Sequence, residues 1–350
     1  MTIESGSTAE SGSADDLGVM RETGLVAAVD LGGTYTKIGL IDHSGTVRAE
    51  TKVPTKITAG PNGDGGLGTV SWLGDEIAAF IDTEATRLGE SVAGFGVIVP
   101  GIIDSAAGAV IAAPNIGWYE VEVAGPLTER LGLPGAIGHD VRTAGLAEWQ
   151  LGAARGSSNL LFVPLGTGIA AAVVVDGRML EADGYAGELG HTPVPAAGEL
   201  VCACGGIGCL EIVASAAGVV RNYTRVTNTD SSPSAEQIAA AAREGDHAAL
   251  AAFDVAGTAL AEAFVIAVTL FGPETIVIGG GLSGAADLLL PRIEQEFDRR
   301  LTFQRRPSLI ISAFGSQAGM VGAGLLGWRS VVSLDQDSVV SLDQDGIRGE

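Results

Sequence analysis

Two segments of this 350-residue chain, 25–42 and 160–176, follow the same plan: an apolar strand, a glycine- and threonine-rich turn, and a second strand ending in aspartate. The turns are Gly32-Gly33-Thr34 and Gly166-Thr167-Gly168. Each segment predicts a β-hairpin whose turn can present backbone N–H groups to an anion. A single turn of this kind is more often a plain connection, but two in one chain could hold a polyphosphate from opposite sides.

Polar side chains around the first turn suit a magnesium-bound phosphate. Thr34 and Thr36 add hydroxyl groups and Lys37 adds positive charge, while the glycines let a phosphate approach the main chain. Asp30 ends the preceding strand, where a carboxylate can hold a hydrated Mg²⁺. The alternative for this turn, taken alone, is a purely structural role.

All three cysteines of the chain lie between positions 202 and 209, and one of its four histidines lies eleven positions before the first of them. They provide three thiolates and one imidazole, a complete tetrahedral set for a structural Zn²⁺: His191, Cys202, Cys204 and Cys209. The alternative is that three small apolar side chains happen to be cysteines, but their clustering favours a metal. An odd cysteine count in one cluster also indicates a reducing compartment, so we expect a cytoplasmic protein.

Two other polar residues have both a structural and a functional interpretation. Asn115 offers a donor and an acceptor, which suits adjacent sugar hydroxyls, yet an Asn in a turn is common for structural reasons. Asp140 lies where a predicted strand meets a helix. It is placed either as a helix N-cap or at the strand edge where open α/β folds bind ligands.

The hydrophobic pattern predicts an α/β protein, and the length suggests two domains. The predicted helices are 69–88, 126–131, 141–153, 234–243, 248–271, 285–301 and 318–328, and the further predicted strands are 92–99, 136–140, 274–278 and 308–312. No apolar run reaches about 18 residues without a charge or a turn, so no membrane span is expected. The net charge of −22 argues against nucleic acid or an anionic membrane as a partner.

The two ends of the chain are acidic and low in apolar residues. Residues 1–22 are rich in serine, glycine and acids, so we expect disorder there and no secretory signal. Residues 331–337, Val-Val-Ser-Leu-Asp-Gln-Asp, are repeated at 339–345. We expect the tail 331–350 to be disordered as well.

With these features in place, the sequence over roughly 25–328 resembles the ROK family of repressors and sugar kinases. The resemblance is carried by Asp30–Lys37, Leu165–Ile169, Ile278–Ser283 and the Glu188–Glu211 cluster. It implies the two-domain actin-like and hexokinase-like ATPase fold, with RNase-H-like domains and a cleft between them. The smaller domain would comprise 23–136 with 316–330, and the larger one, with the zinc motif, 137–315.

The family's functional residues transfer to matching positions of this chain. The resemblance implies that Asp140 is the general base, that Gly101 lines the sugar pocket, and that His191 serves zinc and sugar with one ring nitrogen each. The implied hydroxyl ligands are Asn115, Asp140, Glu188, His191 and Glu211. The implied nucleotide contacts are Asp30 with Mg²⁺, Gly32, Gly33, Thr34, Thr36, Lys37, Gly166, Thr167, Gly168 and the adenosine motif Gly279, Gly280 and Gly281.

Two positions depart from the family pattern. The family commonly has Asn-Asp-Ala-Asn around its base, whereas this chain has His139-Asp140-Val141-Arg142. The base is kept, but Arg142 brings a cation close to the sugar pocket. After the second turn the family continues with glycines, where this chain has Ala170-Ala171-Ala172.

The resemblance implies ATP-dependent transfer of a γ-phosphoryl group to the 6-hydroxyl of a hexose, most simply glucose. Kinases for N-acetylglucosamine, N-acetylmannosamine, mannose or fructose are the alternatives, and a sugar-sensing repressor lacking its DNA-binding domain is a remote one. The donor is expected to be ATP with Mg²⁺ rather than polyphosphate. Family membership also suggests a homodimer or homotetramer.

Overall fold

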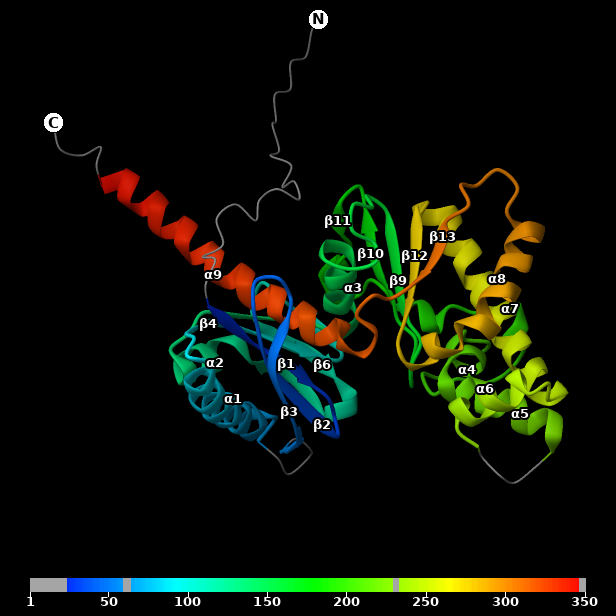
Figure 1. Ribbon diagram of the computed structural model, residues 1–350, viewed down its shortest axis with the longest axis horizontal. Helices are drawn as coiled ribbons and strands as arrows, with labels where there is room; N and C mark the ends of the chain where they lie inside the picture. Colours follow the sequence, from blue (N-terminus) through cyan, green and yellow to red (C-terminus); the bar gives the residue numbers. More distant parts are fainter. Residues whose placement is uncertain (1–23, 59–63, 229–232, 346–350) are drawn as a thin grey trace, which may run out of the picture.

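The computed structural model describes residues 24–58, 64–228 and 233–345, with side chains up to Val332. The predicted disorder of 1–22 and the last five residues of the tail lie outside these ranges. The described chain forms two lobes side by side, each built on a five-stranded sheet (Figure 1). The sheets have the orders β3-β2-β1-β4-β8 and β11-β10-β9-β12-β13.

Both sheets have the same topology. In each, the first three strands along the chain form an antiparallel meander, and the next two strands extend it in parallel. The strands of the first sheet are β1 (Leu25–Leu31), β2 (Tyr35–Ile41), β3 (Val47–Pro54), β4 (Val92–Val99) and β8 (Gly135–His139). Those of the second are β9 (Leu160–Pro164), β10 (Ala172–Val175), β11 (Arg178–Met179), β12 (Thr275–Gly279) and β13 (Ser308–Ile311). The duplicated sheet confirms the predicted fold class.

Helices cover both faces of the first sheet. The helices α1 (Leu67–Leu88) and α2 (Ala124–Leu131) pack on one face, and α9 (Ala318–Asp345) packs on the other. Close approach of α9 requires glycine at position 96, because a Cβ there would lie 2.0 Å from the carbonyl oxygen of Ala323. A small sheet of β5 (Ile102–Asp104), β6 (Ala109–Ala113) and β7 (Trp118–Glu122) extends the core of this lobe.

The second lobe places α3 (Asp140–Gln150) on one face of its sheet and a helical layer on the other. That layer consists of α4 (Glu211–Ala214), α5 (Ala216–Thr227), α6 (Ala235–Arg243), α7 (His247–Phe271) and α8 (Ala286–Arg300). By length and composition α7 could cross a membrane, but 67% of its most apolar window is buried within the lobe. It is therefore the central core helix of this lobe.

Short 3₁₀ turns connect these elements: η1 (Pro114–Ile116), η2 (Ala182–Gly184), η3 (Leu189–His191), η4 (Pro195–Ala197), η5 (Gly281–Ala285) and η6 (Gly315–Gln317). The chain passes between the lobes twice, from β8 into α3 and from β13 through η6 into α9. The helices α3 and α9 pack together there through Leu146 and Leu325. Gly322 permits their contact, because a Cβ there would lie 2.1 Å from the carbonyl oxygen of Thr143.

Among the predicted element boundaries that differ from the structure, two concern the repeated tail and the candidate site. The last helix was predicted to end at Trp328, but α9 continues to Asp345, so the repeated segment is helical where it was expected to be disordered. The strand predicted from Ile169 begins only at Ala172. A longer turn results because the Ile169 N–H is bonded to a side chain, Glu211, instead of joining the sheet ladder.

Candidate functional site

The first glycine turn joins the end of β1 to the start of β2 at an exposed edge of the first lobe. A Cβ on Gly32 would lie 2.7 Å from the carbonyl oxygen of Tyr35, so only glycine allows this turn. Gly33 and Thr34 are exposed, as a ligand-binding turn requires. Thr36 is fully buried, and its hydroxyl contacts that of Thr55 at 2.9 Å. Thr36 therefore stabilises the turn from its buried side, through its hydroxyl contact with Thr55.

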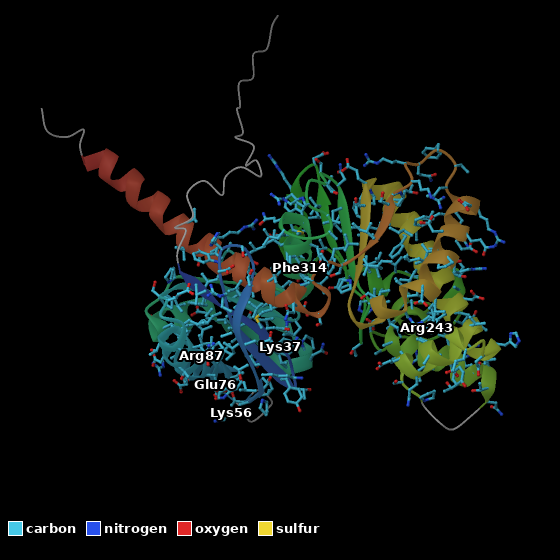
Figure 2. The ribbon with its side chains drawn as sticks, viewed as in Figure 1. Lys37, Lys56, Glu76, Arg87, Arg243 and Phe314 are labelled. Atoms are coloured by element: carbon cyan, nitrogen blue, oxygen red, sulfur yellow. The ribbon has the colours of Figure 1, made fainter. Side chains whose placement is uncertain are left out.

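Asp30 and Lys37 form a pair beside this turn. They are direct neighbours in the β1–β2 register, and Nζ of Lys37 lies 3.7 Å from Oδ2 of Asp30 (Figure 2 labels Lys37). Burial raises the pKa of Asp30 above its usual value, the Lys37 charge opposes this rise, and the negative charge of Asp140 adds to it. Two carboxylates whose negative charges act on each other favour a bound cation.

The second and third glycine turns pack against each other. A Cβ on Gly280 would lie 2.4 Å from the carbonyl oxygen of Leu165, and the Leu165 N–H donates to the Gly279 carbonyl at 2.9 Å. Thr167 and Gly168 are exposed next to this contact, and Gly281 is exposed on the other side. The predicted phosphate turn and the predicted adenosine turn thus form one continuous surface.

Glu211 joins the cysteine loop to the second turn. Its Oε2 accepts the Ile169 N–H at 2.9 Å, and a Cβ on Gly168 would lie 2.8 Å from the same oxygen. One carboxylate oxygen of this predicted sugar ligand is therefore already engaged by the backbone of the phosphate turn. Glu211 therefore connects the predicted sugar site to the predicted phosphate turn, which the sequence motifs had placed in separate segments.

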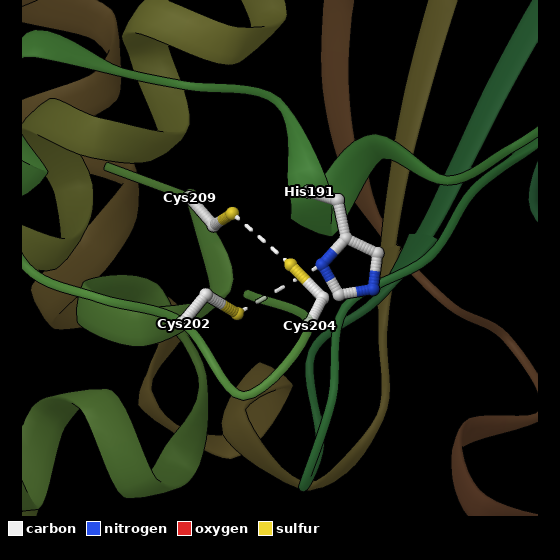
Figure 3. A group of neighbouring side chains, drawn as sticks. All are labelled: His191, Cys202, Cys204 and Cys209. Carbon is white, nitrogen blue, oxygen red and sulfur yellow. Dashed lines mark hydrogen bonds between the residues drawn. The ribbon is translucent and has the colours of Figure 1, made fainter. Parts of the chain in front are cut away.

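The four predicted metal ligands converge on one point (Figure 3). Their ligand atoms all lie within 4.8 Å of one another. Sγ of Cys202 lies 3.9 Å from Nδ1 of His191, and Sγ of Cys204 lies 3.7 Å from that of Cys209. Ligands at about 2.3 Å from a tetrahedral zinc ion are about 3.8 Å apart. The spacing and the donor set therefore fit a closed metal site.

Cysteine binds a metal ion as the thiolate, so any protonated thiol in this cluster must release its proton when the ion binds. Burial, followed by the neighbouring thiols Cys204 and Cys202, raises the pKa of Cys209 to about 12. The Gly206 N–H is the largest cause that lowers the pKa of the exposed Cys204. A metal ion that replaces the Cys209 proton would couple its binding to pH.

The two ring nitrogens of His191 face different partners. Nδ1 is directed at the thiols, and Nε2 lies 3.9 Å from Oε2 of Glu188. Glu188 is exposed. One ring nitrogen thus faces the thiols and the other does not, and the contact of the second nitrogen with a sugar stays a prediction.

Asp140 begins α3 with its side chain 40% exposed. Its Oδ1 accepts the Val141 N–H at 2.7 Å. Desolvation raises the pKa of Asp140, whereas the Val141 N–H and then the Arg142 charge lower it.

His139, and not Asp140, is the N-cap residue of α3. Its Nδ1 accepts the Val141 and Arg142 N–H groups at 3.2 and 3.3 Å. Burial, followed by the Arg142 charge, lowers the pKa of His139 to about 4. The imidazole is therefore neutral, and its 3.3 Å contact with Asp140 is not an ion pair. Since His139 caps the helix, Asp140 is free for another role.

The remaining predicted sugar residues lie on the first lobe. Gly101 has φ of 113°, and a Cβ there would lie 2.3 Å from the carbonyl oxygen of Ala112. Asn115 is exposed in η1, and its carbonyl oxygen lies 3.8 Å from where a Cβ on Gly33 would stand. Asn115 thus borders the first phosphate turn.

Comparisons with known proteins agree with this arrangement. The model of the ROK family matches residues 26–329. A glucokinase of Halalkalibacterium halodurans is 32% identical over 313 residues, which cover 85% of this chain and 93% of that protein. A ROK family glucokinase structure from Streptomyces griseus, in complex with glucose and AMPPNP, superposes with a TM-score of 0.72 at 28% identity, covering 87% of this chain and 100% of that one. A ROK family transcriptional regulator, homologous to the Escherichia coli MLC protein, superposes with a TM-score of 0.79 at 30% identity, covering 88% of this chain and 78% of that one.

Proposed function

The chain belongs to the ROK family, and we propose that it is an ATP-dependent glucokinase that phosphorylates the 6-hydroxyl of glucose. The proposal is supported by the electrostatic influence of Asp140 on the Asp30 turn and of Glu188, beside the metal cluster, on both neighbours of Asp140, His139 and Arg142. A carboxylate near both a phosphate site and a sugar site is positioned for phosphoryl transfer.

Asp140 would act as the general base. Its Oδ1 is held by the Val141 N–H, which leaves Oδ2 to take the proton of the sugar hydroxyl as the phosphoryl group is transferred. The raised pKa brings the carboxyl group closer to the range where a base is most effective. Base catalysis of this kind contributes about 10²- to 10⁴-fold in rate.

The phosphate side of the reaction would rest on the two glycine turns. Their exposed N–H groups would hold the triphosphate, and Lys37 would add positive charge. Mg²⁺ bound near Asp30 would neutralise charge on the β- and γ-phosphates. Movement of the proposed domains, 23–136 with 316–330 against 137–315, would exclude water from the cleft.

The sugar side would be formed by Gly101, Asn115, Glu188, His191 and Glu211. Zinc would have a structural role, because four protein ligands leave no open coordination position for a substrate. Held by the metal through Nδ1, the His191 ring would keep Nε2 directed to Glu188 and the sugar hydroxyls. The metal cluster would thus orient the sugar ligands without taking part in the reaction.

One experiment distinguishes glucose from other sugar acceptors and ATP from polyphosphate as the phosphoryl donor. ADP release is measured with glucose, mannose, fructose, N-acetylglucosamine and N-acetylmannosamine, and glucose phosphorylation is measured with ATP and with polyphosphate. We expect the highest kcat/KM for glucose with ATP. Sugar binding without turnover would indicate a sensor related to the transcriptional regulators, and a preference for an acetamido sugar would contradict the glucokinase assignment.

Two further properties belong to the same proposal. Relatives named glucokinase and the thiol cluster support a cytoplasmic enzyme. We also propose a homodimer or homotetramer, as expected for the family, and sedimentation or light scattering of the purified protein tests it.

A further inference from the structure

Arg142 is a buried cation in the first turn of α3, only 7% exposed. A positive charge is unfavourable both in a protein interior and at a helix N-terminus, so such a residue needs specific compensation. Burial lowers the pKa of Arg142, whereas the acids Glu181, Asp140 and Glu188 raise it, in that order. The acids come from two different segments, the start of α3 and the loop that leads to the metal cluster.

The guanidinium group of Arg142 holds that loop directly. Its Nη1 donates to the carbonyl oxygens of Gly184 at 3.1 Å and Ala186 at 3.3 Å. Both acceptors are backbone groups, so the contact fixes the course of the chain rather than a side-chain rotamer. The loop from 181 to 188 is thereby joined to the helix turn that carries Asp140.

The held loop is in an unfavourable backbone conformation. Ala182 and Asp183 have φ of 47° and 53°, a left-handed conformation that is costly for residues with a Cβ. Such a conformation persists only where surrounding contacts determine it. The two hydrogen bonds from Arg142 are contacts of this kind, because the first of their acceptors, the Gly184 carbonyl, directly follows Asp183.

The same loop also contacts the opposite lobe. A Cβ on Gly184 would lie 3.0 Å from both Cγ2 of Ile102 and the carbonyl oxygen of Ile103. These residues form β5, which directly follows Gly101. Arg142 therefore fixes a loop that packs next to the proposed sugar pocket on one lobe and carries Glu188 on the other.

The far end of the loop is fixed independently. The Ala171 N–H donates to the Gly187 carbonyl at 2.7 Å, and a Cβ on Gly187 would lie 2.1 Å from the Ala171 carbonyl oxygen. Glu188 follows immediately. Its position is thus set by Arg142 on one side and by the segment after the second glycine turn on the other.

We propose that Arg142 is a positioning residue for the sugar: by holding the Gly184 and Ala186 carbonyls, it sets the distance between Glu188 and Asp140 and thereby the selectivity for the acceptor. This inference rests on the proposed kinase function and deepens it. Arg142 acts through Glu188 and needs no contact with the transferred phosphoryl group. Its effect therefore concerns sugar binding more than the chemical step.

The test compares Arg142→Lys with the unmodified chain. Lysine keeps the charge, but its shorter side chain does not place an ammonium nitrogen where Nη1 of Arg142 donates to both carbonyls. We expect the KM for glucose to rise about tenfold, the KM for ATP to stay unchanged and kcat to change less than about threefold. The ratio of kcat/KM for glucose over mannose should fall, because Glu188 is less fixed.

Two controls make the result decisive. Arg87→Lys changes an exposed arginine of α1, paired with Glu84, and should leave all constants unchanged. Arg142→Met, which has no charge, should raise the glucose KM further, and thermal unfolding of each variant reports how much of it is folded. If Arg142→Lys instead lowered kcat or the folded fraction with an unchanged glucose KM, its role would be structural and the inference wrong.

The result also separates this inference from the proposed function. An active unmodified enzyme with no KM effect in Arg142→Lys would overturn the inference alone. An unmodified chain that phosphorylates none of the sugars would overturn the glucokinase assignment and this inference with it.

Discussion

The carboxylate of Glu148, in α3, accepts the backbone N–H of Phe314 at 3.0 Å, and so joins the two segments by which the chain passes between the lobes. Glu148 is fully buried. Its oxygens also accept the Ala313 N–H at 3.1 Å, the Ala153 N–H at 2.9 Å and the Ser312 hydroxyl. Figure 2 labels Phe314 between the two lobes. A carboxylate that accepts four donors fixes this connection.

Glu148→Gln should destabilise the protein markedly. An amide turns an NH₂ group towards donors that need an acceptor, so at least one buried N–H loses its partner. We expect a loss of about 2–4 kcal/mol in the free energy of unfolding, measured by urea denaturation. The control Glu84→Gln breaks an exposed pair with Arg87 and should cost less than about 0.5 kcal/mol. Equal effects of the two changes would contradict the role of Glu148.

Asp140→Asn should abolish most of the turnover and leave the fold intact. The amide cannot take the sugar proton, so kcat should fall by about 10²- to 10⁴-fold, while the thermal unfolding temperature and the zinc content stay near those of the unmodified chain. Asp254→Asn, on an exposed part of α7, serves as the control. Near-normal turnover of Asp140→Asn would exclude it as the base.

Strands and helices with a continuous apolar pattern were predictable, and strands with mixed patterns were not. The prediction for β4 matches the structure at both ends. In contrast β3, which alternates charged residues with small apolar ones, was missed although Val47, Ala49 and Val53 mark its inner face. The two-residue alternation, with Arg48, Glu50 and Lys52 at the exposed positions, was a usable signal, but β3 lacks the continuous apolar run of β4.

The metal ligands could be predicted because they are close in sequence, whereas contacts between distant segments could not. His191 lies eleven residues from Cys202, and the pattern of donors defines the site. The Glu148 carboxylate and the Phe314 N–H are 166 positions apart, and no local pattern pairs them. The same holds for Arg142 and Gly184, which only the folded loop brings together.

Cys204→Ser should reduce metal content, stability and glucose affinity together. With one thiolate removed, the remaining ligands hold the ion less tightly, and His191 is no longer fixed through Nδ1. Zinc per chain is measured by mass spectrometry and glucose affinity by calorimetry, before and after chelation. Ile207→Val, in the same loop but outside the ligand set, should change neither. If the metal were lost and glucose affinity stayed the same, the proposed coupling would be wrong.

His139 should make the protein less stable as the pH falls. Its pKa is about 4 in the folded protein and about 6.5 in an unfolded chain. Between these values the unfolded chain binds a proton that the folded one does not, so the free energy of unfolding decreases as the pH falls from 6.5 towards 4. At about 1.4 kcal/mol per pKa unit, the loss is at most about 3.5 kcal/mol.

His139→Asn isolates this contribution, because asparagine caps a helix well and does not titrate in this range. Urea denaturation at pH 7, 5.5 and 4.5 should show a flatter pH dependence for the variant than for the unmodified chain. The acids Asp30 and Asp140, whose pKa values are raised, act in the opposite direction in both proteins and cancel in the comparison. His43→Asn, at an exposed position, should leave the slope unchanged. Parallel curves for the unmodified chain and His139→Asn would show that the imidazole is not held neutral by the N–H groups of α3.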